Sequence, residues 1–327
     1  MAKPYLLPAV ALLDASFPLP LDRPFTAPMA SSAGVLAKDL TALVRRGLLR
    51  RLLRNVYVAA QVTDSLALRT EALRLVVPAG AVVTDRTAGW LHGAEMILAP
   101  GDHVVVPPVS VFHRGRGHRL RNGLVTSGQR MMTDDDVMEI NGICVTTPLR
   151  TACDLGRSRS RDGAFATMSM MLRLGHFSHQ ELVDASAGFR GYRNVRQLRA
   201  LAPLVDSRVE SPPEAVVLLR WLDCPDLPRP EPQRRVPAPL WADAAYYAID
   251  LGIDELRFGV EYDGEEFHGP DRRDHDSTRR EWITQQQFWI LRVVLKQNVF
   301  GRDRDIEQIL RAGVREARAR MGTRRWV

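Results

Sequence analysis

The chain contains few cysteines: Cys144, Cys153 and Cys224 are the only ones among its 327 residues. They lie far apart, and none of them belongs to a CxxC pair. Three separated thiols cannot build a disulfide framework, and they lack the paired spacing of a structural zinc site. The cysteine content therefore indicates a reducing compartment, and we expect a cytoplasmic protein.

A long hydrophobic run is also missing. The apolar stretch near the start, Tyr5–Leu13, is interrupted by Pro8 and closed by Asp14. A membrane-spanning helix needs about 20 apolar residues, and the stretch has no small-residue cleavage site of the kind that ends a signal peptide. The sequence predicts neither a membrane anchor nor a secretion signal.

Lysine is scarce, because only three of the 45 basic residues are lysines and arginine supplies the rest. The charge is divided unevenly. Residues 1–205 hold 25 basic and 16 acidic residues, a net charge of +9, whereas residues 206–327 hold 20 and 22, a net charge of −2. A basic half joined to a carboxylate-bearing half predicts a polyanion binder linked to a site that could hold a cation.

The first structural pattern is a helix followed by a hairpin. Apolar residues recur at helical spacing in Leu36–Arg46, and Leu48–Ala59 has the pattern of two strands joined by a turn. With a short segment around Phe25–Ser32, this order predicts a winged helix. Basic residues concentrate there, as in a recognition helix and wing that contact phosphates. They are Lys38, Arg45, Arg46, Arg50, Arg51 and Arg54. A solvated basic face on an ordinary small domain is the alternative.

Residues 63–205 are predicted to form an α/β region. Helices are expected at Asp64–Val77 and Asp85–His92, a strand at His103–Val106, and an arginine-rich loop at Phe112–Gly123. The three methionines of Ala164–Leu174 fit a helix packed in the core.

Three segments of this front part, VRRGLLRRLLRNVYVA (44–59), TAGWLHGA (87–94) and VTTPLRTACDL (145–155), resemble the AbiEi-like antitoxin family. Members of that family pair an N-terminal winged helix with an α/β domain. The resemblance implies sequence-directed DNA binding, often at a promoter. It also makes a toxin or another defence-system protein a candidate partner.

After residue 205 the predicted order of elements is helix, strand, strand, strand, helix, strand, helix. Strands at Tyr247–Ile253 and Arg257–Asp263 are expected to pair as a hairpin. A turn centred between residues 255 and 256 makes one face of this hairpin apolar and places Asp250 directly opposite Glu261. Like charges in that position are destabilising, so we expect both side chains to bind a divalent cation. The alternative is that the carboxylates point into water.

Several stretches of this region resemble the very-short-patch-repair (Vsr-like) endonuclease domain, a branch of the PD-(D/E)xK nuclease superfamily. They are ESPPE (210–214), AIDLGI (248–253), GVEYDGEEFH (259–268), Asp276 with Arg279 and Arg280, and FWILRV (288–293). The resemblance implies an αβββαβ core of restriction-endonuclease type in which Asp250 and Glu261 hold Mg²⁺ or Mn²⁺. Two positions depart from the superfamily pattern, since Asp263 replaces the lysine and Gln287 replaces a glycine.

The remaining candidate residues surround that metal site. With the lysine missing, proton transfer falls to His268 or to a metal-bound water. Asp263 is expected to add an outer-sphere hydrogen bond, and Arg279 and Arg280 to hold the scissile phosphate, unless they are ordinary surface arginines. Glu214 either completes a capping box or points toward the metal through water.

These patterns predict three domains: a leader and winged helix (1–62), an α/β middle domain (63–205) and a nuclease-like domain (206–327). The predicted function is a Mg²⁺-dependent DNA endonuclease, guided to DNA by the winged helix and serving phage defence or DNA repair. The competing hypothesis is a non-enzymatic regulator of antitoxin type whose nuclease-like domain is a remnant.

Overall fold

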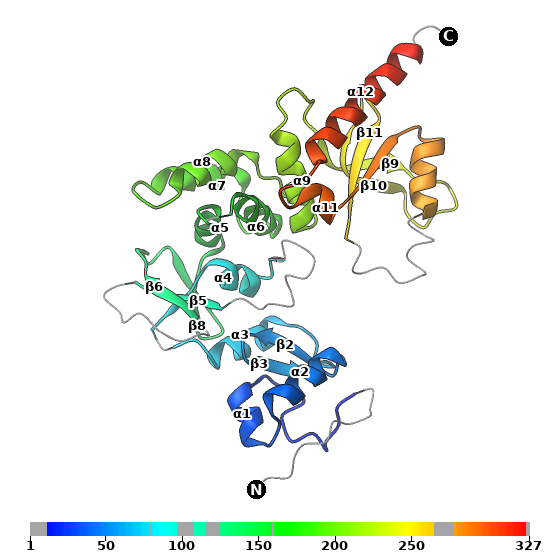
Figure 1. The fold of residues 1–327 in the computed structure, drawn as a ribbon. Coiled ribbons are helices and arrows are strands. Elements are labelled where there is room, and N and C mark those ends of the chain that lie inside the picture. The colour runs from blue at the N-terminus through cyan, green and yellow to red at the C-terminus, as the bar shows by residue number, and fades with distance from the viewer. Residues whose placement is uncertain are drawn as a thin grey trace. The chain divides into compact units, whose positions relative to one another are not determined.

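The computed structural model describes residues 12–78, 80–96, 108–114, 125–158, 160–264 and 277–324. These residues form a mixed α/β protein with several sheets and helices (Figure 1). The chain divides into two compact units, one made of Met1–Ala94 and Asp102–Asp154 and the other of Glu95–Gly101 and Leu155–Val327. Within the described parts of the chain, every helix is too short or too polar to cross a membrane.

The first unit begins with two helices and a small sheet. Its elements are β1 (Phe25–Thr26), α1 (Ala27–Ser32), α2 (Ala37–Arg45), β2 (Leu49–Leu53) and β3 (Val56–Ala59). The strands pair in the order β1-β3-β2, and Asn55 has the left-handed φ of 61° that a tight turn between β2 and β3 requires. The predicted helix and hairpin are therefore confirmed. Leu36, which we expected on the apolar face, instead precedes the helix and is exposed.

A five-stranded sheet forms the rest of this unit. Its elements are α3 (Leu66–Arg74), β4 (Val82–Val83), α4 (Asp85–His92), β5 (Val109–His113), β6 (Val125–Gln129), β7 (Val137–Ile140), β8 (Ile143–Thr146) and α5 (Pro148–Gly156). The strand order is β6-β5-β4-β8-β7. The two predicted helices are confirmed. Phe112 and His113 end strand β5 instead of starting a loop, while the predicted strand at 103–106 and most of that loop lie outside the described residues.

The second unit begins with helices. They are α6 (Arg161–Arg173), α7 (His179–Gly188), α8 (Val195–Leu201), the 3-10 turn η2 (Ala202–Leu204) and α9 (Pro212–Leu222). Met168, Met170 and Met171 are buried on α6, which confirms their predicted role in the core. Helix α6 packs against α9, and ion pairs Arg161–Asp223 and Arg220–Asp162 join the two helices.

A four-stranded sheet follows, with strand order β12-β11-β10-β9. Its region contains β9 (Glu231–Pro237), β10 (Tyr246–Ile253), β11 (Phe258–Asp263), a helical segment at 277–281 that continues into η3 (Trp282–Gln286), β12 (Ile290–Leu295), α11 (Lys296–Val299) and α12 (Ile306–Arg324). The register predicted for the hairpin is confirmed, because Leu251 pairs with Val260 and Ile253 with Phe258. Strand β12 runs parallel to β11.

Helices α9 and α12 pack against this sheet (Figure 1). The Phe258 ring lies 5.6 Å from the Trp221 ring of α9, measured between centroids. Gly313 lets α12 approach, since a Cβ there would lie 2.2 Å from the Phe258 ring. These contacts bury the apolar face of the hairpin, and the carboxylates belong to its other face.

The two units place helices α6–α8 in the same compact body as the C-terminal sheet. The division into domains at 62/63 and 205/206 stays a prediction.

Candidate functional site

The basic residues of α2 and the β2–β3 hairpin form a largely exposed group, which we call the helix–hairpin face. Five of the six are exposed: Lys38, Arg45, Arg46, Arg51 and Arg54. The nearby acid, Asp39, is only 7% exposed, and its carboxylate accepts a hydrogen bond from the Leu36 backbone N–H. The acid is therefore used inside the fold as a helix cap, and it does not neutralise the basic surface.

Arg50 differs from the other five. Its guanidinium donates to the backbone carbonyl of Val62, and the residue is half-buried. Arg50 therefore supports the hairpin, and its predicted contact with DNA stays untested.

A second polar cluster lies on strands β10 and β11, and we call it the carboxylate cluster. The Tyr262 backbone N–H donates to Asp250 Oδ2 over 2.8 Å, and Asp250 and Glu261 each lie one residue beyond Leu251–Val260, the last pair of the hairpin ladder. Glu261 is only 2% exposed. Its two oxygens accept hydrogen bonds from Arg279 Nη2 at 2.6 Å and from Arg280 Nε at 2.9 Å.

The two arginines come from the helical segment at 277–281. Arg279 also donates to the backbone carbonyl of Ala248, and Arg280 donates to Asp263 Oδ2 over 3.0 Å. Sequence reasoning expected a metal ion to offset the opposed carboxylates and these arginines to hold a phosphate. The structure places the guanidinium groups on the carboxylates themselves, so part of the negative charge is offset within the chain.

Glu214 joins the cluster from the first turn of α9. Ser211 Oγ donates to Glu214 Oε1 over 2.7 Å, and the Glu210 backbone N–H donates to Oε2 over 2.9 Å. Gln233 Nε2 also donates to Oε2, over 3.2 Å. Half of the predicted capping box is present, because Ser211 Oγ accepts from the Glu214 backbone N–H over 3.4 Å. The Glu214 carboxylate takes the Glu210 backbone N–H instead of that of Ser211, so both alternatives for this residue stay predictions. Burial raises the pKa of Glu214 above its ordinary value.

Asp250 is the most perturbed carboxyl group of the cluster. Burial among protein atoms, followed by the nearby charges of Glu214 and Glu261, raises its pKa well above the ordinary value for an aspartate. When all four carboxylates of the cluster are ionised, Arg279 and Arg280 offset two of their four negative charges.

The fit of Mg²⁺ can be judged from these contacts. Both oxygens of Glu261 are already bonded to arginine. Among the described residues, no three or more His, Cys, Asp or Glu side chains are arranged to hold a metal ion. The Mg²⁺ site stays a prediction, and an ion bound there would share the Glu261 carboxylate with the two arginines. His268, the expected proton-transfer residue, lies outside the described residues.

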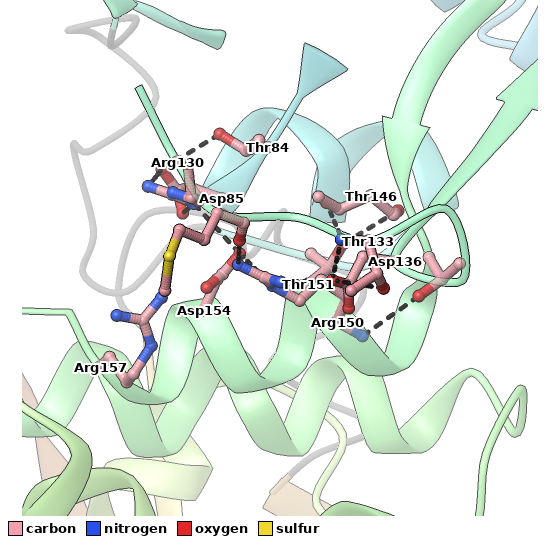
Figure 2. A network of polar contacts seen from close by, with 12 residues as sticks. Thr84, Asp85, Arg130, Thr133, Asp136, Thr146, Arg150, Thr151, Asp154 and Arg157 are labelled. Carbon is pink, nitrogen blue, oxygen red and sulfur yellow. Dashed lines mark hydrogen bonds and ion pairs between the residues drawn. The ribbon is translucent and has the colours of Figure 1, made fainter. Parts of the chain in front are cut away.

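Sequence reasoning missed a third polar cluster, in the first unit, and we call it the Arg150 network (Figure 2). Arg150 is 4% exposed and bonds three groups: Asp154 Oδ2 at 3.0 Å, Asp136 Oδ2 at 2.7 Å and the Met131 carbonyl at 2.9 Å. Arg130 Nη1 donates to the same Asp154 oxygen over 3.1 Å.

Asp85 at the start of α4 completes this network. It accepts two hydrogen bonds from Arg130, at 2.6 and 3.0 Å, and has a left-handed φ of 52°. A backbone held in this region is strained and persists only where surrounding contacts fix it. One signal was visible in the sequence, because Arg150 and Asp154 stand four residues apart within the helical segment PLRTACDL.

Comparison with known proteins relates the middle of the chain to one family. The AbiEi antitoxin C-terminal domain family matches residues 79–204. This range contains the Arg150 network and two of the three segments on which the resemblance rested, but it does not contain the helix–hairpin face.

Two curated relatives extend over a larger part of the chain. They are the uncharacterized proteins MT2308 and Rv2248, from two strains of Mycobacterium tuberculosis. Each is 29% identical over 271 residues, which cover 80% of this chain and 91% of the relative. Residues 79–204 are thus similar to the C-terminal domain of AbiEi antitoxins, and most of the chain is similar to the two mycobacterial proteins.

Proposed function

We propose that this protein is a DNA-binding regulator of antitoxin type that contacts duplex DNA through the helix–hairpin face. The observation that carries the proposal is the set of five exposed basic side chains on α2 and the hairpin, among which the acid Asp39 is buried. A helix followed by a paired hairpin has the order of a winged helix, in which the helix enters the major groove and the hairpin contacts the backbone. The antitoxin-family match of residues 79–204 supports the same function.

The test is the salt dependence of duplex binding. Neutralising one phosphate contributes about 0.9 to the slope of log K against log salt. If both contact phosphates, replacing Arg45 and Arg46 by Ala should lower the slope of the full chain by about 1.8. Arg315→Ala with Arg318→Ala is the control, because these two arginines are also exposed on a helix and the change in charge is the same. An equal decrease of the slope in both variants would mean that binding depends on the net charge of the protein and not on this face.

A toxin or another defence-system protein remains a candidate partner, on the strength of the antitoxin-family match. Co-expression of the protein with the products of neighbouring genes, followed by purification, tests for such a partner.

A second candidate function is metal-dependent hydrolysis of DNA at the carboxylate cluster. The specific observation in its favour is the grouping of the carboxyl groups of Asp250, Glu214 and Glu261, where burial and the charges of the other two raise the pKa of Asp250. The order of helix, three strands, helix and strand around this group supports a PD-(D/E)xK-type core. Against it stands the engagement of both Glu261 oxygens.

Cleavage assays decide between the two candidates. Plasmid and single-stranded DNA are incubated with the protein and Mg²⁺ or Mn²⁺, or with a chelator. A nuclease loses its cleavage in Asp250→Asn and Glu261→Gln, and His268→Ala slows it about 10² to 10⁴-fold if the histidine transfers a proton. A regulator shows no metal-dependent cleavage in any of these proteins while its duplex binding persists.

A further inference from the structure

A basic groove lies in the second unit, beside the edge strand β9. It has a volume of about 590 Å³. One wall is β9 itself, a second is the segment that leads into α9, and a third is Arg173, the last residue of α6. This volume is in the range of small-molecule sites and suits one or two nucleotides.

The lining residues of the groove have an excess of positive charge. Four arginines line it, Arg173, Arg208, Arg234 and Arg235, together with two glutamates, Glu210 and Glu231, so the lining sums to +2. Asp206 and Asp254, which are not part of the lining, pair with Arg208 and Arg234 and offset this difference. Both glutamates pair with groove arginines, because Glu210 contacts Arg173 at 3.1 Å, and Glu231 contacts Arg208 at 3.3 Å and Arg234 at 2.8 Å.

These ion pairs are weak enough to be exchanged. In the Arg173–Glu210 and Arg208–Glu231 pairs both side chains are exposed, and such pairs contribute little to stability. A phosphate diester presents acceptor oxygens that guanidinium groups bind well, and often through two hydrogen bonds. Arg208 also donates to Asp206 through Nε and Nη2, so a phosphate would replace Glu231 at its Nη1. The groove therefore offers guanidinium groups that a phosphate can recruit at small cost.

Arg235 adds a surface of a different kind. It is exposed, and among the described residues it makes no ion pair. Its guanidinium lies 4.2 Å from the centre of the Tyr246 ring, which is 42% exposed. A planar cation on an accessible aromatic ring is the type of platform on which an unpaired base stacks. A duplex keeps its base faces covered, so the platform favours a single strand.

The groove also adjoins the carboxylate cluster. Gln233 lines the groove and donates to Glu214, and the backbone of Glu210 donates to the same carboxylate. Gln233 has a left-handed φ of 52° at the position that the pairing of β9 with β10 sets opposite Asp250. A strand lying in the groove would thus pass beside the residues that hold Glu214.

We propose that this groove binds a single-stranded nucleic acid, with its phosphates on Arg173 and Arg208 and a base on the Arg235–Tyr246 platform. This binding goes beyond the duplex contact proposed for the helix–hairpin face and uses no residue of it. The site is composite, since Arg173 belongs to α6 and the other residues follow position 205.

The experiment uses the full chain in which Lys38, Arg45, Arg46, Arg51 and Arg54 are all Ala, so that the helix–hairpin face does not contribute. Binding of a fluorescent 12-nucleotide single strand is measured by anisotropy. Arg235→Ala should weaken binding about tenfold, because stacking on one base is lost. Arg235→Lys should weaken it to a similar degree, because the charge stays but the planar stack is lost. Arg208→Ala should weaken binding and lower the salt slope by about 0.7, the single-strand value.

Arg161→Ala is the matched control, because Arg161 is a partly exposed, ion-paired arginine on α6 outside the groove. Its binding should equal that of the parent, and thermal denaturation should show that all variants are folded. Unchanged binding in Arg235→Ala and Arg208→Ala would overturn the proposal, as would an equal loss in Arg161→Ala. Competition by AMP at the same nucleotide concentration as the strand would also overturn it, because the groove would then be a site for a free nucleotide. These results do not depend on the helix–hairpin face, so each proposal can fail alone.

Discussion

At the scale of single residues, Asp250 accepts a hydrogen bond from the Tyr262 backbone N–H and lies near two further carboxyl groups, those of Glu214 and Glu261. Strand alternation and the turn position predict that it stands opposite Glu261, because the side-chain period of a strand is fixed. The offsetting groups were not predictable in the same way. Arg279 and Arg280 come from a helical segment whose position over the strands depends on the packing of the whole sheet. The arginine contacts of Glu261 could therefore not be read from the sequence, while the metal ion stays a prediction.

The raised pKa of Asp250 leads to a prediction about stability. The folded state holds the Asp250 proton more tightly than the unfolded state does. Ionisation of Asp250 therefore opposes folding as the pH rises from the ordinary pKa of an aspartate through the raised pKa of Asp250. In a chelator, Asp250→Asn should therefore be more stable than the parent at neutral pH, by about 1 kcal/mol or more, which is roughly 2–4 °C in Tm. The advantage should shrink as the pH falls toward 4. A gain that does not change with pH would show that the charge is not its source.

The Arg150 network gives a second prediction at this scale. Replacing Arg150 by Met leaves Asp154 and Asp136 buried or half-buried with fewer partners, so the free energy of unfolding should fall by about 3 to 5 kcal/mol. Arg161→Met is the control, because its ion pair with Asp223 is more exposed and should be worth at most about 1 kcal/mol. Urea denaturation measures both. Similar losses in the two variants would mean that the network contributes no more than a surface ion pair.

At the scale of elements, the sequence predicted the helices and strands well where the local pattern is strong. Helix α4 and the β10–β11 register match the predictions because caps, turns and alternation are local signals. The Arg150 network was not predicted. Its five charged members come from α4, from α5 and from the segment between β6 and β7, and only Arg150 and Asp154 stand at a spacing that the sequence reveals.

Helix α12 provides the prediction at this scale, because its Gly313 sits against the Phe258 ring of β11. Gly313→Ala should force the helix away from the sheet and destabilise the second unit by about 1 to 3 kcal/mol, as overpacked cores do. Gly322→Ala on the same helix is the control, since a Cβ there meets no atom within 4 Å and alanine is the better helix former. Thermal denaturation should show a lower Tm only for Gly313→Ala. Equal Tm values would mean that α12 can shift without loss.

At the scale of the whole molecule, charge and composition suggested a boundary at residue 205, between a basic and a nearly neutral part. The net charge of a region reflects what its surface binds. The division into compact units instead reflects which residues pack in the same core. Helix α6 carries its buried methionines and packs against α9, so the contacts of the second unit run across residue 205. A sequence shows the change in charge directly, but it does not show which helices pack together.

This difference makes the fragment 1–205 informative. Cutting there removes α9 from α6, together with the partners of Arg161 and Asp162, so apolar surface of α6 should become exposed. The fragment should bind a hydrophobic dye such as ANS, and trypsin should cut within α6–α8 faster than in the full chain. The helix–hairpin face belongs to the other unit, so duplex binding should persist. A fragment that binds no dye and resists trypsin as the full chain does would instead establish an independent domain ending at residue 205, because its apolar surface would then be complete without α9.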